Sequence, residues 1–494
     1  MEDLLLGIDI GTSACKIAIF NKKGDVIAQS NQSYQLYYPN PGWVEQDPDE
    51  WWDSICLGIK DCLAQSGADP VQIKGIGIDG QSWSSIPVDR DGNCLHNTPI
   101  WMDTRAKDIA ERVTKEVGAD RIFEVAGNAF LPSYTAPKIL WFKEERPEIY
   151  EKTYKFLHSN SYIGMKLTGV MSSDKCQNYG IHFFNMKTCT YDMELAEEIG
   201  ISIDKVPDIY DCHDIIGSVT KAAAEITGLA EGTPVVAGGL DAACGTLGAG
   251  VYKAQQTQIQ GGQAGGMSIC EDKPIAHPKL ILSTHVIPDL WLLQGGTVGG
   301  GGVLRWFKQE LGGGQSFDEL TALAEAVEPG SDGVVFLPYM SGERCPIWNP
   351  DAKAVFYGLG FDKTKGHMLR AALEGVVFSV AHNLKVAEEA GANIKEMDIR
   401  AMGGAANSRL WMQMYADVTG CRISIPASDT ATTLGAAILA GVGIGMYGSF
   451  EEAVEETVKI TRVQEPVAEN HKKYMESMEL YLELSEKLKD TFSR

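Results

Sequence analysis

Residues 4–20 read LLLGIDIGTSACKIAIF, two apolar runs joined by a short turn. Each run, at 4–10 and at 16–20, has the length and composition of a buried strand. A second turn of polar residues and glycine leads to a third run at 26–29, which is typical of a hairpin. The chain therefore opens as strand, phosphate-sized turn, strand, turn and strand.

The first turn has the chemistry of a phosphate site. Asp9 stands near the end of the first strand, and Gly11, Thr12 and Ser13 follow. Glycine lets backbone N–H groups approach phosphate oxygens, and the two hydroxyl groups add donors. Asp9 can order the water shell of Mg²⁺, and Lys16 can reach a phosphate as a point charge. An ordinary β-turn is the alternative. A P-loop is excluded, because Gly-x4-Gly-Lys-Ser/Thr does not occur.

The remaining pattern indicates an α/β fold that is built twice. Strand and helix patterns alternate up to residue 245, and a strand–turn–strand pattern like the opening one recurs at 256–270. We expect two similar halves with a cleft between them. The further elements expected are strands at 73–78, 256–260 and 267–270 and helices at 49–64, 104–117, 367–390, 408–419 and 433–440.

The predicted boundaries are 1–246 for the first domain, 247–450 for the second and 451–494 for a helical tail. Within the tail, Leu, Met and Tyr recur among charged residues over 465–492, which predicts an amphipathic helix. We expect this helix to dock on the body of the same chain. A homodimer contact is the alternative.

Asp241 is a lone carboxylate among small residues, in the run Gly-Gly-Leu-Asp-Ala-Ala-Cys-Gly at 238–245. A surface charge cluster does not explain it. Facing the cleft, it can accept the proton of an attacking hydroxyl group, a role worth about 10²–10⁴-fold in rate. Phosphoryl transfer otherwise depends mainly on positioning and charge neutralisation. An Asx-turn or a helix cap is the alternative.

Two glycine-rich loops, at 295–302 and 401–408, lead into helical patterns. Both permit the close backbone approach that a nucleotide base or phosphate requires. Tight helix packing is the alternative for each. The first loop is not a Rossmann fingerprint, because it does not lie in a strand-to-helix turn with an acidic residue about 20 positions on.

Aromatic and polar residues gather after a strand end at 80–83 (Gly-Gln-Ser-Trp) and before a helix at 101–105 (Trp-Met-Asp-Thr-Arg), and Trp43 adds another ring. Sugar and polyol sites often pair an aromatic face with Asp, Gln and Arg groups. Core tryptophans and a helix cap at Asp103 are the alternative.

Composition excludes several classes of partner. Lys and Arg number 43 against 66 Asp and Glu, a net charge of −23 that would repel nucleic acid. The 11 cysteines are scattered without Cys-x-x-Cys, as in a cytosolic protein with reduced thiols, and the 9 histidines are dispersed, so no zinc site is expected. The acidic N-terminus lacks a signal peptide's basic region, and no run of about 20 apolar residues occurs. We therefore expect a soluble, cytoplasmic protein without a membrane partner.

These residues together resemble the FGGY family of carbohydrate kinases, within the superfamily of actin-, hexokinase- and Hsp70-type ATPases. The resemblance is closest to xylulokinase-like members and runs from residue 4 to 445, with the final helix also family-like. Its motifs, in chain order, are 9–13, 43–47 with 50–52, 80–81, Trp101-x-Asp103-x-Arg105, 138–141, 167–169, 239–241, 336–339 with 342–344, 370–375 including Glu374, and 403–404.

The resemblance implies an α/β fold of two actin-like ATPase (ribonuclease H-like) domains around a central cleft. The first domain would bind sugar and phosphate and the second would bind nucleotide, with lobe closure to exclude water. Asp241 would be the base that activates a sugar hydroxyl, and the implied cofactors are ATP and Mg²⁺, with Asp9 at the metal. The ATP contacts expected are Asp9, Gly11, Thr12, Ser13, Lys16, Gly262, Gln263, Gly299, Gly300, Gly403, Gly404 and Asn407, and those to the sugar are Gln81, Ser82, Trp83, Asp103 and Asp241.

Three departures from the family pattern bear on the substrate and the phosphates. Xylulokinases usually carry Gly-Gln-Met-His-Gly at 80–84, and Trp83 here replaces the histidine, which removes a polar sugar contact. Ala242 replaces the usual Asn after the catalytic Asp. The second phosphate loop, usually Gly-Thr-Ser-Gly, reads Gly-Gln-Ala-Gly at 262–265. Two hydroxyl donors are lost there, and the Gln263 amide and backbone N–H groups would substitute.

The sequence thus predicts an ATP-dependent kinase that transfers the γ-phosphoryl group to a hydroxyl of a ketose, with conversion of D-xylulose to xylulose 5-phosphate as the first expectation. L-xylulose, ribulose, a hexulose, gluconate and a quorum-signal diol are alternative substrates. A non-catalytic, nucleotide-binding sugar sensor is the alternative outside enzymes. It would explain the altered phosphate loop but not the presence of Asp241 and both glycine-rich loops.

Overall fold

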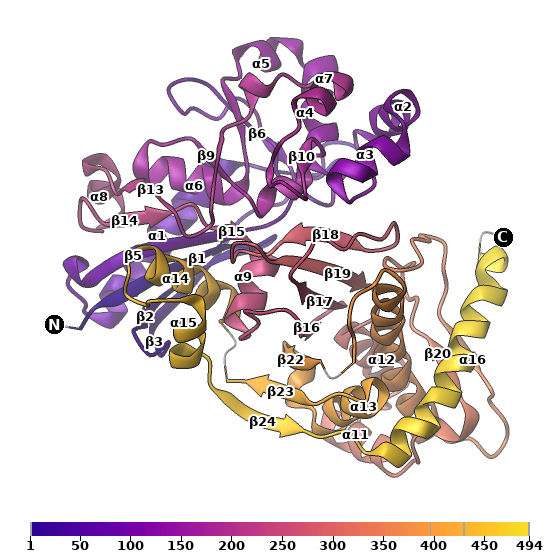
Figure 1. Cartoon of the computed structure of the whole chain (residues 1–494). Coiled ribbons are helices and arrows are strands. Elements are labelled where there is room, and N and C mark those ends of the chain that lie inside the picture. Colours follow the sequence, from indigo (N-terminus) through magenta and orange to yellow (C-terminus); the bar gives the residue numbers. More distant parts are fainter. Residues whose placement is uncertain (1, 396, 428–429, 493–494) are drawn as a thin grey trace.

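The computed structural model describes residues 2–395, 397–427 and 430–492. Its frame is two seven-stranded sheets, one from each half of the chain, with helix α9 (Asp241–Gly248) between them (Figure 1). Helices and short strands from the chain between β5 and β13 form a lobe above the first sheet (Figure 1). The predicted α/β class, with two halves, is confirmed.

The first sheet contains the opening strands as predicted, because β1, β2 and β3 form an antiparallel meander. β5 and β14 then pair in parallel beside β1. All residues of β1 are buried, as expected for an apolar run in a sheet that is covered on both faces. The strands in spatial order are β13 (Ile215–Ser218), β14 (Pro234–Val236), β5 (Ile73–Gly80), β1 (Leu4–Ile10), β2 (Ala14–Asn21) and β3 (Val26–Ser33), with β15 (Gly239–Leu240) paired to β5.

The second sheet repeats this topology. β16 pairs with β17 in antiparallel and with β22 in parallel, as β1 does with β2 and β5. The recurrence that the sequence predicts near residue 256 is therefore a true structural repeat. The strands in spatial order are β18 (Ile281–Thr284), β19 (Trp291–Thr297), β17 (Gly265–Glu271), β16 (Gln256–Gly261), β22 (Asp398–Met402), β23 (Ile423–Pro426) and β24 (Ile460–Gln464).

The helices that the sequence predicts all occur, with ends within a few residues of those expected. Short paired strands outside the sheets are β4 (Glu45–Gln46) with β7 (Thr98–Pro99), β6 (Ile86–Val88) with β8 (Lys155–Leu157), β9 (Ser172–Asp174) with β12 (Asp208–Tyr210), β10 (Phe184–Asn185) with β11 (Thr190–Tyr191), and β20 (Val335–Leu337) with β21 (Val355–Tyr357). The other helices are α1 (Pro48–Ser66), α2 (Lys107–Val117), α3 (Ala119–Ala126), α4 (Thr135–Glu145), α5 (Pro147–Lys152), α6 (Ser159–Thr168), α7 (Met193–Ile199), α8 (Lys221–Thr227), α10 (Gly301–Glu310), α11 (Phe317–Glu325), α12 (Lys365–Glu389), α13 (Arg409–Thr419), α14 (Ala431–Gly443), α15 (Phe450–Thr457) and α16 (Ala468–Phe492).

Helix α1 shows how local sequence sets an element. The Asp47 side chain caps its start by accepting from the backbone N–H of Asp49, and Gly67 ends it in the left-handed conformation, at φ 62°. Ile55 and Ile59 are one helical turn apart and fully buried against the first sheet. Each such side chain contributes about 1.5–3 kcal/mol by leaving water.

Helix α14 packs against β1 and β5 of the first sheet and against α9, although its sequence lies within the predicted second domain. The approach is very close, because a Cβ added at Gly77 would lie 1.8 Å from the carbonyl oxygen of Ala436. Glycine alone lets a helix backbone come so near to a strand. This contact joins the two halves and places Thr432 beside Asp9.

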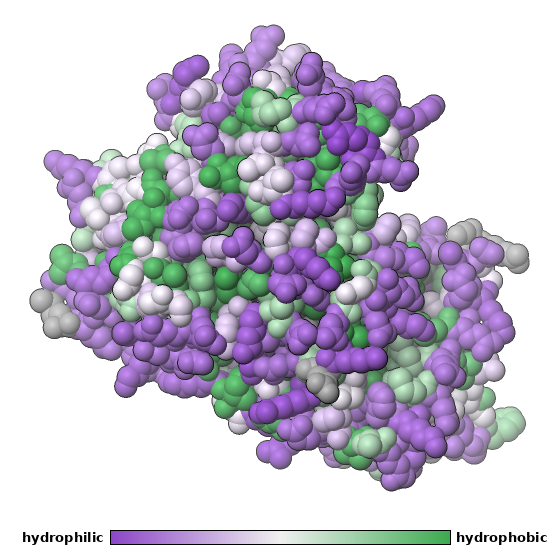
Figure 2. Space-filling view, viewed as in Figure 1, coloured by the Kyte–Doolittle hydropathy of each residue, from purple (hydrophilic) through white to green (hydrophobic). Residues whose placement is uncertain are grey.

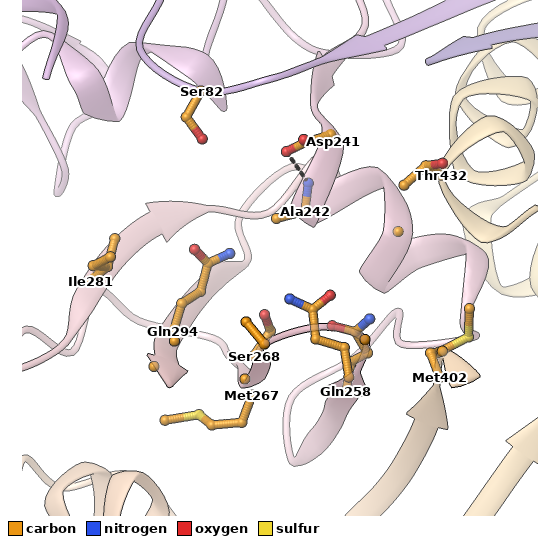
Figure 3. Close-up of a pocket in the computed structure, with 18 of the residues that line it drawn as sticks. Ser82, Asp241, Ala242, Gln258, Met267, Ser268, Ile281, Gln294, Met402 and Thr432 are labelled. Carbon is orange, nitrogen blue, oxygen red and sulfur yellow. Dashed lines mark hydrogen bonds between the residues drawn. The ribbon is translucent and has the colours of Figure 1, made fainter. Parts of the chain in front are cut away.

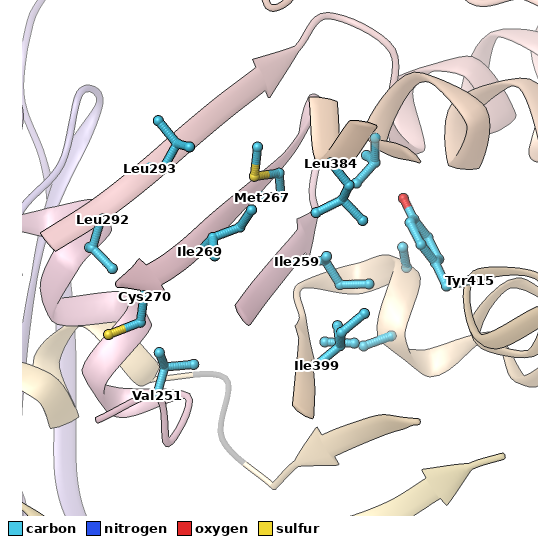
Figure 4. Packing of buried hydrophobic residues seen from close by; sticks show 14 of the residues in the cluster. Val251, Ile259, Met267, Ile269, Cys270, Leu292, Leu293, Leu384, Ile399 and Tyr415 are labelled. Carbon is cyan, nitrogen blue, oxygen red and sulfur yellow. The ribbon is translucent and has the colours of Figure 1, made fainter. Parts of the chain in front are cut away.

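The second half has its own core, in which Leu384 of α12 and Tyr415 of α13 lie beside Ile259 and Ile399 of the sheet (Figure 4). The tail helix α16 docks on this half, as predicted. Its Tyr474 hydroxyl accepts a 2.7 Å bond from Arg370 of α12.

Hydrophilic residues cover most of the face shown in Figure 2, with apolar residues in small groups. None of the helices in the described part of the chain is both long and apolar enough to cross a membrane.

Candidate active site

A cavity of about 610 Å³ lies between the two halves, beside α9. Figure 3 shows Asp241 above its centre, with Ser82, Gln294 and Ile281 on one side and Thr432 and Met402 on the other. Walls from both sheets meet here, so the predicted central cleft is present. The lining includes Thr12, Lys16, Ser82, Trp83, Trp101, Tyr179, Asp241, Gln258, Gly262, Gln263, Ser268, Gln294, Arg344, Met402, Gly403, Gly404 and Thr432.

Asp241 is the first residue of α9 and is half-buried in the cavity wall. One carboxyl oxygen accepts a 2.6 Å bond from the backbone N–H of Ala242, and no other described residue bonds to the group. Burial, and next the charge of Asp9, raise the pKa of Asp241 from 3.8 to about 7. A carboxyl group that faces a cavity and titrates near neutrality has the properties of a general base.

The first phosphate turn, residues 11–13, borders the cavity through Thr12, and Lys16 lines it from β2. Asp9 is buried at the end of β1, where its Oδ2 accepts from Thr432 Oγ1 at 2.7 Å and from Lys16 Nζ at 3.5 Å. Trp101 Nε1 donates to Thr12 Oγ1 at 3.0 Å. The turn is therefore held from both halves of the chain.

The second turn lies opposite the first and carries Gly262 and Gln263. Its carbonyl groups accept from the backbone N–H groups of Gly301 and Gly302, at 2.7 and 3.0 Å, which ties this turn to the glycine-rich loop at 295–302. Gln263 Oε1 accepts from Arg305 at 2.8 Å. The amide nitrogen of Gln263 bonds to no described residue, so it is the part of this side chain that can donate to a ligand.

At the end of the cavity where the nucleotide is expected, Gly403 and Gly404 line it and are exposed. Of the residues expected at ATP, six do not line the cavity, namely Asp9, Gly11, Ser13, Gly299, Gly300 and Asn407. Gly299 packs toward Pro338 and Gly300 toward Ala264, and Asn407 lies at the far end of the short turn that starts at Gly404. These three support the loops instead of lining the cavity.

At the other end, the Trp83 ring stacks on Tyr134, with centroids 4.0 Å apart and planes at 25°. Two buried donors here meet no acceptor among the described residues, Trp83 Nε1 and Gln294 Nε2. The Tyr179 hydroxyl donates to Ser82 Oγ at 3.2 Å. Native structures rarely leave buried donors unpaired, so a ligand with hydroxyl acceptors is expected to complete them.

Asp103 and Gln81, expected at the sugar, do not line the cavity. The Asp103 carboxylate is buried, binds the Arg105 guanidinium at 2.8 Å and accepts from the backbone N–H of Val44 at 2.6 Å. The Gln81 amide donates to Gln46 at 2.7 Å. Their bonds hold the loops at 80–83 and 101–105 in place. The expectation that Asp103 and Gln81 contact the sugar directly is corrected on this ground.

A buried lysine also supports these loops. Lys138 Nζ donates to the carbonyl oxygens of Trp83, at 3.0 Å, and of Ile100, at 2.6 Å. Burial lowers the pKa of Lys138 to about 7. Trp83 itself has φ 61°, a left-handed conformation that costs a bulky residue about 1–3 kcal/mol. The bond from Lys138 holds that conformation.

Sequence reasoning missed several lining residues, namely Tyr179, Gln258, Ser268, Gln294, Arg344, Met402 and Thr432. Arg344 stood in a recognised motif without a role. Tyr179 lies in the short 3₁₀ turn Gln177–Gly180, and the others reach the cavity through sheet register or through α14, for which the sequence carries no local signal.

The carboxylates near the cavity suit Mg²⁺ that is bound together with ATP phosphates better than a metal ion that is held by protein side chains alone. In the described part of the chain, no three or more His, Cys, Asp or Glu side chains form a metal cage. Mg²⁺ commonly takes one or two carboxylates, several waters and substrate phosphates. Asp9 beside two phosphate-sized turns matches that pattern.

Comparison with known proteins decides the family. Residues 4–248 match the N-terminal domain, and residues 267–444 the C-terminal domain, of the FGGY family of carbohydrate kinases. This chain belongs to that family. Xylulose kinase of Bacillus subtilis is 31% identical over 488 residues, 98% of this chain and 97% of that protein. Gluconokinase of Bacillus licheniformis is 30% identical over 505 residues, 100% of this chain and 98% of that protein.

Solved structures of FGGY kinases agree. Xylulose kinase from Rhodospirillum rubrum superposes with a TM-score of 0.93 at 27% identity, over 99% of this chain and all of that one. Gluconate kinase from Lactobacillus acidophilus gives 0.92 at 25%, over 100% of this chain and 99% of that one. The two-domain FGGY fold and carbohydrate kinase activity are thereby established. The boundaries 1–246, 247–450 and 451–494 stay predictions, as do the roles of single site residues.

Proposed function

We propose that this FGGY kinase transfers the γ-phosphoryl group of ATP to a hydroxyl of a small ketose, with D-xylulose as the first candidate. Relatives named xylulose kinase match this chain over nearly its full length, in sequence and in structure, and this supports a ketose as the substrate. The observation that carries the chemistry is Asp241, a carboxyl group with pKa raised to about 7 at the centre of the cavity wall, between its two ends.

Asp241 acts on the attacking hydroxyl. As the sugar oxygen forms its bond to the γ-phosphorus, the bond from that phosphorus to the bridging oxygen of ADP breaks, and the hydroxyl proton passes to the Asp241 carboxylate. The group must be ionised beforehand. Its raised pKa makes it a stronger base than an ordinary aspartate, while about half of it is ionised at pH 7 and most of it at slightly alkaline pH.

The two turns would receive the phosphates, with Thr12, Lys16 and the Gln263 amide as donors. Asp9 would hold the Mg²⁺, and the Thr432 hydroxyl orients one Asp9 oxygen. When bound, Mg²⁺ supplies charge neutralisation on the phosphates. Gly403 and Gly404 leave room for the adenosine, since neither carries a side chain.

The sugar would lie over Trp83 and Ser82, where the unpaired Gln294 and Trp83 donors meet its hydroxyl groups. The test is ADP release with Mg²⁺–ATP across pentuloses, hexuloses, polyols and aldonates, with Asp241→Asn as control. We expect one ketose to stimulate wild type strongly and the variant hardly at all. Stimulation by no ketose would refute the substrate proposal, and normal turnover in Asp241→Asn would refute the base.

An aldonate such as gluconate is a second candidate, favoured by Arg344. This half-buried side chain lines the cavity, and its guanidinium has no ion pair or hydrogen-bond acceptor among the described residues. It lies 6.0 Å from the Trp101 ring centroid. An unpaired guanidinium matches a carboxylate with two parallel bonds. Selective loss of aldonate turnover in Arg344→Met would support this candidate, and equal loss for ketoses would not.

We further propose a cytoplasmic location, because all 11 cysteines are free thiols, as in a reducing compartment. Helix α16 packs against its own chain. A homodimer contact through α16 stays a prediction.

A further inference from the structure

Asp79 is a buried carboxyl group next to the phosphate site. It lies near the end of β5, with no exposed surface, and neither of its oxygens meets a hydrogen-bond donor among the described residues. Leaving a carboxylate buried and uncompensated costs several kcal/mol. Such a group in a native protein calls for a missing partner, such as an ion.

Strand register places Asp79 beside Asp9. β1 and β5 pair in parallel, with Gly7 opposite Gly77 and Asp9 opposite Asp79. A Cβ on either glycine would meet α14 backbone, so both glycines face α14. Side chains alternate along a strand. Asp9 and Asp79, each two residues further on, therefore project from that same face, at the strand ends that border the phosphate turn.

The charges at this edge do not balance. Gly239, two residues before Asp241, pairs with Asp79 in the same sheet, so a third carboxyl group lies close by. The cation at hand is Lys16, whose side chain is 53% exposed and 3.5 Å from Asp9. Asp79 and Asp9 are paired across adjacent strands, and two carboxylates this close on one face repel unless a proton or a cation lies between them. When Asp9 and Asp79 are both ionised, one largely exposed lysine does not neutralise them, and a further cation is needed.

We propose that Asp79 is a second carboxylate of the divalent-cation site, and that with Asp9 it holds the metal that accompanies the ATP phosphates. The proposal rests on the proposed function, because the phosphates complete the coordination. Two carboxylates, substrate phosphate and water form the oxygen set that Mg²⁺ uses. Asp241 is then left for the sugar hydroxyl. In the competing account, Asp79 is a permanently neutral acid that bonds to Asp9 and never meets the metal.

Asp79→Asn separates the two accounts, because Asn has the same size and is always neutral. Mn²⁺ binding to enzyme with no more than one equivalent of ADP, followed by the loss of the free Mn²⁺ electron paramagnetic resonance signal and corrected for Mn²⁺ bound by ADP alone, measures the site without turnover. We expect Asp79→Asn to weaken Mn²⁺ binding by about 10–100-fold, the usual effect of losing a group that serves a metal. Affinity within twofold of wild type would overturn the proposal.

Three controls keep the result readable. Asp9→Asn should weaken Mn²⁺ binding in the same way, whereas Asp241→Asn should leave it unchanged. Metal-free Asp79→Asn should melt no lower than wild type, since it loses an uncompensated charge. If it fails to fold, Asp79→Ser, with a smaller side chain, gives the same reading. No sugar is present, so a failed substrate panel leaves this test valid, and a failed Mn²⁺ result leaves the kinase proposal standing.

Discussion

Lowering the pH from 8 to 6 should disable the base that we assign to Asp241. Burial and the charge of Asp9 raise its pKa from 3.8 to about 7. The carboxylate accepts a proton only when ionised, so activity rises with pH through this pKa. With a pKa of 7, about 90% of the group is ionised at pH 8 and about 10% at pH 6. We therefore expect kcat/KM for the sugar to fall about tenfold over this range, at saturating Mg²⁺–ATP.

Among the other groups that titrate in this window, Glu343 and Lys138 bond to loops that border the cavity and must be separated from Asp241. Burial raises the pKa of Glu343 to about 7, and burial lowers that of Lys138 to about 7. Glu343 accepts from the backbone N–H of Val298, in the glycine-rich loop at 295–302, at 2.7 Å. Protonation of Glu343 would therefore also affect the rate. Glu343→Gln and Lys138→Met are the matched controls. Both should keep the acid limb of the profile if Asp241 causes it.

Asp241→Asn should lower kcat by about 10²–10⁴-fold and flatten the profile of the activity that remains. A wild-type kcat/KM that is constant between pH 6 and 8 would refute the reasoning. So would an acid limb that persists in Asp241→Asn, or one that disappears in Glu343→Gln alone.

Gly77→Ala should lower the free energy of unfolding by about 1–3 kcal/mol, because its methyl group would meet the Ala436 carbonyl oxygen; an unchanged urea midpoint would contradict this close contact. Arg370→Met should cost about 3–5 kcal/mol in the same assay, since it leaves the buried Glu374 without its ion pair, and a loss below about 1 kcal/mol would show that the pair is dispensable. Thr432→Val should weaken Mg²⁺–ADP binding by about three- to tenfold through loss of its carboxylate bond, and calorimetry with unchanged affinity would contradict that role.

Much of the fold is predictable because its strands and amphipathic helices carry strong periodic signals. β1 and β2 are nearly continuous apolar runs, and their recurrence as β16 and β17 exposes the repeat. The place of α14 is not predictable in this way. Its residues are mostly Ala, Gly, Leu and Ile with apolar character all round, so no stripe indicates which surface it covers. Only the glycines on β1 and β5 reveal that contact, and they read as ordinary strand glycines.

The site divides along similar lines. Thr12 and Gln263 lie in turns, and Lys16 follows one of them in β2; their chemistry is local, and the cavity does include them. Asp103 shows the limit of motif reading, because the same residue type can bind a ligand or an internal arginine. Here the Asp103 carboxylate forms an ion pair with Arg105, two residues away. Asp79 escaped notice because its neighbour Asp9 is 70 residues distant and meets it only through strand pairing.

The polar residues of the sugar motifs serve the framework, which leaves recognition to other groups. On the first half, the cavity offers mainly the Trp83 and Trp101 rings and the Ser82 hydroxyl. The second half contributes Gln294 and Arg344. A sugar can therefore satisfy its hydroxyl groups only by touching both halves at once. Because Asp241 stands at the start of α9, between the two sheets, the contacts that bind the sugar also fix the position of its hydroxyl group against the base. We therefore expect both binding and orientation of the sugar to require contacts from the two halves together.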